Sequence, residues 1–247
     1  MDWQQLFYLI PVLLFVVLPS LVGIFTALGI AGYAWKRRAV PGARYLGLYM
    51  LAAAIWAVAE LGQQFAGAPR ILALWENIAM IGIVGMPLWW WSFTLKYTGR
   101  VSHLVVKHWL LMAIVPLIIL DVIWFRFLFL PSLPSTPPVL WQLPFLYAFV
   151  ALAIGTANMI RGMIRAPMYR GQFITVLTGI LSVWVVAFIE MAGLQLFPNF
   201  SLLPIAFAAG SLICARGIAR YRTFDIVPVA LDTVIESIDD GIVILDQ

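Results

Sequence analysis

Residues 7–34 read FYLIPVLLFVVLPSLVGIFTALGIAGYA, a stretch without a charged side chain. A helix needs about 20 mostly apolar residues to cross roughly 30 Å of hydrocarbon, so this stretch is long enough to span a bilayer. No basic segment precedes it, and it continues well beyond the length of a signal-peptide core, so we interpret it as a retained span. A fold that contains this segment belongs in a membrane.

The rest of the chain has the same character. Of its 247 residues 64% are hydrophobic and 11% are charged, and the mean hydropathy is +1.00. That composition leaves too little polar surface to coat a water-soluble domain of this size. Apolar runs separated by polar breaks predict an all-α membrane protein, a single bundle of seven transmembrane helices. The predicted spans are 7–34, 44–66, 71–96, 109–130, 140–164, 172–196 and 201–219.

Basic residues gather at one end of the predicted bundle. Thirteen of the fifteen flank alternate loops or follow the last span, and only Arg70 and Arg126 lie toward the other side. Because Lys and Arg beside short loops are retained in the cytoplasm, we predict an external N-terminus and a cytoplasmic C-terminus in a bacterial cytoplasmic membrane. Anionic lipid headgroups favour such charges, and no nucleic-acid partner is expected. The thirteen are Lys36, Arg37, Arg38, Arg44, Lys96, Arg100, Lys107, Arg161, Arg165, Arg170, Arg216, Arg220 and Arg222.

Four carboxylates lie inside the apolar spans, and on this topology all belong to the outer half of the bundle. They are Glu60, Glu76, Asp121 and Glu190. Burying a carboxylate in a membrane helix costs about 3 kcal/mol, so it normally faces a cavity or a partner. Polar and aromatic side chains accompany them, many at helical spacing: Trp56, Gln63, Gln64, Trp75, Asn77 and Trp124. The set predicts an outward-opening pocket, walled by tryptophan, for a small-molecule or lipid-like ligand.

Two other interpretations of these carboxylates stay open at this point. Glu60, Asp121 and Glu190 would also serve as neutral, hydrogen-bonded struts between helices. A proton-sensing role is the second alternative. Glu76 lies about one turn from the outer end of its span, where it could reach the headgroup region or pair with Arg70.

Several kinds of chemistry have no support in the sequence. No Ser/His/Asp set, Gly-rich phosphate loop or Cys/His metal spacing is present, so neither an active site nor a metal site is expected in this chain. Retinal would need a lysine in the seventh span, but Lys36, Lys96 and Lys107 all lie near the cytoplasmic side. We therefore expect no cofactor.

Prolines and small residues predict how the spans bend and pack. A proline inside a helix removes a backbone donor, so local kinks are expected. The prolines concerned are Pro19, Pro87, Pro116 and Pro204. Small residues at every fourth position let membrane helices approach closely. They are Gly23, Ala27 and Ala31 in the first span, and Ala206, Gly210 and Cys214 in the seventh.

The segment after the seventh span has the pattern of a signalling linker. Pro228 fits the first turn of a new helix, whose apolar residues follow the 4-3-4 spacing of a short coiled coil. These are Val227, Leu231, Val234 and Ile238. We expect a transmembrane domain over 1–222, a linker helix over 223–240 and the start of a further domain over 241–247. The residues assigned to signal transmission are the seam residues Leu231, Val234 and Ile238 with Pro204, Arg220, Phe224, Asp225 and Pro228.

One set of motifs resembles a known family. Leu74-Trp75-Glu76-Asn77, Gly82, Pro87, Phe93, Tyr97-Thr98-Gly99-Arg100 and the segment Arg220-Tyr-Arg-Thr-Phe-Asp-Ile-Val-Pro-Val-Ala are similar to the N-terminal seven-transmembrane region of bacterial sensor histidine kinases. The resemblance runs from about residue 46 to 246. It implies a homodimer in which this region precedes a PAS domain and a histidine kinase, or in some members a diguanylate cyclase. Residues 240–246 resemble the entry strand of such a PAS domain.

The sequence thus predicts a sensory input domain, with any kinase activity belonging to a portion outside this chain. Two alternatives come from other classes of protein. A small-solute transporter would show two similar three-helix halves, and no clear repeat is found. A passive membrane anchor for a cytoplasmic domain is the other.

Overall fold

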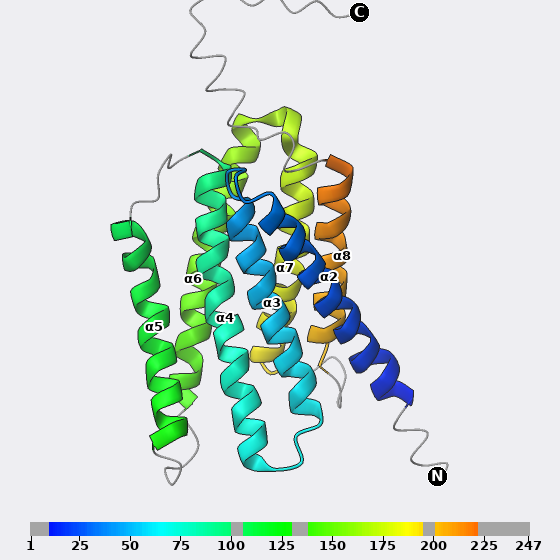
Figure 1. Cartoon of the computed structure of the whole chain (residues 1–247), viewed down its shortest axis with the longest axis vertical. Helices are drawn as coiled ribbons and strands as arrows, with labels where there is room; N and C mark the ends of the chain where they lie inside the picture. The colour runs from blue at the N-terminus through cyan, green and yellow to red at the C-terminus, as the bar shows by residue number, and fades with distance from the viewer. Residues whose placement is uncertain (1–9, 100–105, 130–137, 195–200, 222–247) are drawn as a thin grey trace, which may run out of the picture.

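A computed structural model describes residues 10–99, 106–129, 138–194 and 201–221, and these residues form seven long helices without a strand (Figure 1). All seven are long and apolar enough to cross a membrane, which confirms the predicted bundle. The first begins with a π-helical turn, η1 (Leu13–Val17), and a 3-10 turn, η2 (Pro167–Tyr169), precedes the sixth. The helices are α2 (Leu18–Lys36), α3 (Ala43–Gln64), α4 (Pro69–Tyr97), α5 (Val106–Phe129), α6 (Pro138–Arg165), α7 (Arg170–Met191) and α8 (Leu203–Tyr221).

The helices alternate in direction, so the described basic residues other than Arg70 and Arg126 lie toward the end where α2 and α8 finish (Figure 1). We call this the basic end and the other the opposite end. Guanidinium groups lie over aromatic rings at the basic end, with Arg44 4.5 Å from the ring centroid of Tyr45 and Arg38 5.9 Å from that of Trp35. Aromatic and basic side chains together favour a membrane surface at this level.

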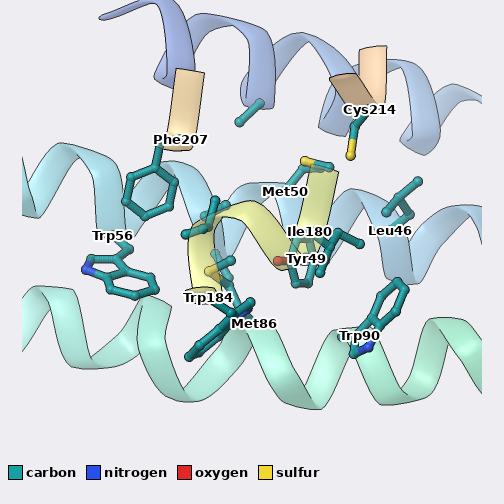
Figure 2. Close-up of a cluster of buried hydrophobic side chains, with 14 of the residues drawn as sticks. Leu46, Tyr49, Met50, Trp56, Met86, Trp90, Ile180, Trp184, Phe207 and Cys214 are labelled. Atoms are coloured by element: carbon teal, nitrogen blue, oxygen red, sulfur yellow. The ribbon is translucent and has the colours of Figure 1, made fainter. Parts of the chain in front are cut away.

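The bundle has a packed interior and one peripheral helix. α3 packs on α2 and α4, α8 packs on α2 and α7, and α6 packs on α4. In contrast, α5 lies at the edge of the molecule, where it packs against α4 and α6 (Figure 1). The largest fully buried side chains include Trp56, Trp90 and Trp184 (Figure 2).

Glycines allow the closest helix contacts. A Cβ atom on Gly23 would lie 3.1 Å from the backbone of Ala208 in α8, and one on Gly179 in α7 would lie 2.7 Å from the carbonyl oxygen of Gly210. The small residues singled out in the first and seventh spans therefore do lie where helices meet, because a larger side chain would separate them.

The prolines differ in their effect. Pro87 and Pro116 lie inside α4 and α5, and Pro144, which was not singled out, lies inside α6. Pro19 follows η1, where the N–H of Leu18 bonds to the carbonyl of Leu13. A π-helical turn of this kind adjusts the backbone pairing next to a proline. The predicted kink at Pro204 is wrong, because Pro204 is in the first turn of α8, where a missing N–H breaks no bond within the helix.

Candidate functional site

The best-defined part of the predicted pocket is a tryptophan that holds a carboxylate. The Nε1–H of Trp56 donates a hydrogen bond of 2.9 Å to Oε1 of Glu60, one turn further along α3. Trp56 is only 1% exposed, and its ring lies 5.6 Å from that of Trp184 in α7 and 5.1 Å from that of Phe207 in α8 (Figure 2). Glu60 therefore has a fixed position at the junction of three helices.

Glu190 lies at the end of α7 and caps the start of α8. Its Oε1 accepts the backbone N–H of Leu202 at 2.6 Å, and both carboxylate oxygens accept the hydroxyl of Ser201 at 3.0 Å. The Ser201 hydroxyl oxygen in turn accepts the N–H of Leu203 at 3.1 Å. These bonds satisfy donors that a helix start leaves without partners. Glu190 thus acts as a strut between two helices, and it lies close enough to Glu60 to interact electrostatically.

Substituting alanine for Glu190 is expected to destabilise the bundle by about 1–2 kcal/mol, since the start of α8 loses its acceptor. The E190Q variant keeps an oxygen that accepts these bonds and should retain most of the stability. Thermal unfolding of purified protein in detergent would measure both variants. Equal losses for alanine and glutamine would show that the charge, and not the cap, is what matters.

The other predicted pocket residues of α3 and α4 vary in burial. Asn77 is 6% exposed, Gln63, Trp75 and Glu76 are half-buried, and Gln64 is exposed. The ring of Trp75 covers Gly62, where a Cβ atom would lie only 2.8 Å from its Cε3 atom. Through this contact the first half of α4 packs closely against the end of α3.

Asp121 and Trp124 lie apart from this group, on α5. Asp121 is exposed, and Trp124 packs edge-on against Phe127 with ring centroids 5.9 Å apart. The structure brings together Trp56, Glu60 and Glu190, which lie on α3 and α7. It does not place Asp121 with them, because α5 packs on α4 and α6.

A hydrogen-bonded junction at the basic end was not anticipated from the sequence. The hydroxyl of Tyr97, at the end of α4, donates to Oε1 of Gln172 at 2.8 Å. The Nε2 of Gln172, in the first turn of α7, donates to the carbonyl oxygen of Tyr221, the last residue of α8, at 3.0 Å. Tyr97 is fully buried and Gln172 is 5% exposed. One amide side chain therefore joins three helix ends where the chain leaves the bundle.

A continuous row of buried aromatic side chains connects this junction to Glu60. The ring centroid distances are 6.2 Å for Tyr49 and Trp90, 5.7 Å for Trp90 and Phe93, and 5.0 Å for Phe93 and Tyr97. Tyr49 is also a neighbour of Trp184, which packs on Trp56 (Figure 2). The row runs through the bundle from the opposite end to the basic end.

The predicted transmission residues are described only in part. Pro204 is buried at the start of α8, and Arg220 is exposed in its last turn. Phe224, Asp225, Pro228, Leu231, Val234 and Ile238 lie outside the described residues.

Seven membrane helices with a packed interior define a multi-pass membrane protein, and a hydrogen-bonded junction lies at its basic end, where α8 finishes. Residues 19–228 match the family described as the N-terminal 7TM region of histidine kinase, and the chain belongs to that family. The region is the sensory part of such kinases and is not itself catalytic. No curated protein and no solved structure matches the chain.

Proposed function

We propose that this domain receives a signal at the membrane and passes it through α8 and the following linker to a cytoplasmic output domain, a histidine kinase of a two-component system. The observation that carries the proposal is the Gln172 bridge, because it attaches the last residue of α8 to the ends of α4 and α7. Movement of either helix would therefore reach the exit of the chain directly.

The buried aromatic row supports a path from the opposite end to that exit. Large rings in contact repack in discrete steps, so a change around Trp56 and Glu60 would displace neighbours up to Tyr97. The ligand proposed for this path is a small or lipid-like molecule.

The arrangement of charges supports the setting of this function. The basic end faces the cytoplasm of a bacterial cell by the positive-inside rule, so the N-terminus is outside and the linker inside. The coiled-coil spacing of 227–238 favours a homodimer, and the residues from 241 onward fit the start of a PAS domain.

Packing in the bundle centre disfavours the transporter alternative. A cavity enclosed there by α2, α3, α4, α7 and α8 measures about 20 Å³, and its walls include Tyr49, Gly179 and Phe207. That volume holds about one water molecule. A solute would need the helices to separate, whereas a receptor needs only small shifts of packed elements.

A fusion of this chain to a histidine kinase core would test the proposal and separate it from a passive anchor. Q172L removes both hydrogen bonds of the bridge and is expected to change autophosphorylation severalfold in membrane vesicles. Q142L, at an exposed amide of α6 near the opposite end that belongs to no predicted site, is the matched control and should leave the rate unchanged. An unchanged rate in both variants, at equal folded yield, would favour the passive anchor and contradict the proposal.

A further inference from the structure

A large cavity lies between the peripheral helix α5 and its neighbours, away from the site described above. Its volume is about 580 Å³, within the range of about 300–1,000 Å³ that is typical of small-molecule sites. Its walls come from three helices, and none of the residues predicted for the polar pocket lines it. The wall residues include Trp91 of α4, Met112, Val115 and Ile119 of α5, and Tyr147 and Val150 of α6.

This cavity opens toward hydrocarbon and not toward water. Its rim consists of apolar side chains on the outer faces of α5 and α6, with Leu146 62% exposed, Val150 53% exposed and Val115 45% exposed. In a membrane-spanning bundle such faces contact lipid tails. An occupant therefore enters sideways from the bilayer and has a long apolar portion.

One polar group in the wall has no hydrogen-bond partner among the residues that the structure describes. The hydroxyl of Tyr147 is buried, and among the described residues it makes no hydrogen bond. A buried hydroxyl without a partner is costly, so native structures normally satisfy it. A ligand that presents a hydrogen-bond acceptor at this point would satisfy it.

A positive charge lies beyond the end of the cavity that is nearer the opposite end of the bundle. Arg126 is half-buried on α5 and follows Ile119 by seven residues, so it lies on the cavity-lining face, about 10 Å nearer the opposite end. Side chains on a helix tilt toward its N-terminus. Because α5 and α6 are antiparallel, Arg126 tilts toward the cavity and Tyr147 tilts toward Arg126 (Figure 1).

We propose that this cavity binds a single-chain anionic amphiphile of the long-chain fatty acid class. The alkyl tail lies between α5 and α6, and the carboxylate lies at the end of the cavity that is nearer the opposite end of the bundle. There it accepts a hydrogen bond from Tyr147 and faces the guanidinium of Arg126. The assignment deepens the proposed sensory function, on which it rests for its biological meaning, by naming the class of ligand and its route of entry.

Photolabelling tests the site directly. The probe is a stearic acid that carries a diazirine on its tail, used with the intact chain in phosphatidylcholine nanodiscs. Labelling is expected on the peptides that contain 112–119 and 143–154. Stearate should compete about tenfold better than stearyl alcohol, the size of one hydrogen bond to a charged group. The R126Q variant should remove that preference, and Y147F should weaken it.

Matched variants at equally exposed valines separate the cavity from general lipid contact. V150F fills the cavity and should lower labelling about tenfold, since the tail loses its place. V185F on α7 should leave labelling unchanged, because Val185 is 54% exposed, like Val150, and does not line the cavity. Both side chains are half exposed, so each variant is expected to fold.

Three results would overturn the assignment. Even labelling over all helices would show ordinary lipid contact, and equal competition by a two-chain phospholipid would show the wrong ligand class. Cross-links between two copies through this face would show that a helix fills it. Binding that left kinase output unchanged would uphold the site and contradict only its link to signalling. If no labelling is seen but Q172L still alters kinase output, the fatty-acid site is contradicted and the proposed sensory function stands.

Discussion

The G82A variant is expected to be less stable than the natural protein by about 1–3 kcal/mol, the usual cost of overpacking a core. A Cβ atom on Gly82 of α4 would lie 2.6 Å from the Cβ of Trp56 and 2.7 Å from the carbonyl oxygen of Ala52 in α3. Two of the nearest atoms are backbone atoms, which cannot turn aside as a flexible side chain would. The two helices must therefore separate, and the position of Trp56 changes with them.

A second glycine provides the control. Gly32 of α2 is exposed, and a Cβ atom there would meet nothing within 4 Å. G32A should therefore gain stability by about 0.5–1 kcal/mol, because alanine is the better helix former. Unfolding of both variants by SDS titration from mixed micelles would measure the two changes. Shifts in the same direction would contradict the proposed close contact between α3 and α4.

The fold could be predicted from the sequence because its main determinant is one-dimensional. A span needs length and apolarity, and both are visible in a run such as 7–34. The ends of the helices do not follow from apolarity in the same way: Pro204 belongs to the first turn of α8, so the predicted kink does not form. Whether a proline breaks a bond depends on where the helix begins, and apolar runs locate such points only within a few residues.

The candidate site was predicted where its contacts are local. Trp56 and Glu60 are four residues apart on one helix, so their neighbourhood follows from helical geometry. Asp121 is different, because α5 is apolar on nearly every face and its sequence does not distinguish the face toward lipid from the face toward protein. The structure shows Asp121 exposed.

The junction at the basic end could not be predicted because it is both distant in sequence and ordinary in composition. Tyr97 and Gln172 are 75 positions apart, and each lies near the end of a span, where interfacial tyrosines and amides are common. Their hydrogen bond appears only once α4 and α7 are packed together. The carbonyl of Tyr221 carries no sequence signal at all, since every residue has one.

The W56A variant should have the largest effect of any single substitution at the candidate site, a loss of about 3–5 kcal/mol. Trp56 is 1% exposed and packs against Trp184 and Phe207, so alanine leaves a cavity where three helices meet. Unfolding by SDS titration would measure the loss. W35A is the control, because Trp35 is 51% exposed and its contact with Arg38 is worth about 1 kcal/mol or less.

W56F separates the two roles of this side chain. Phenylalanine keeps a ring against Trp184 and Phe207 but has no N–H for Glu60, so part of the stability returns while the carboxylate loses its donor. If the aromatic row transmits the signal, W56F will alter the output of the kinase fusion although it folds, and Q172L will abolish that alteration. Independent, additive effects of W56F and Q172L on output would instead mean that Trp56 only supports the fold, since coupled sites are non-additive.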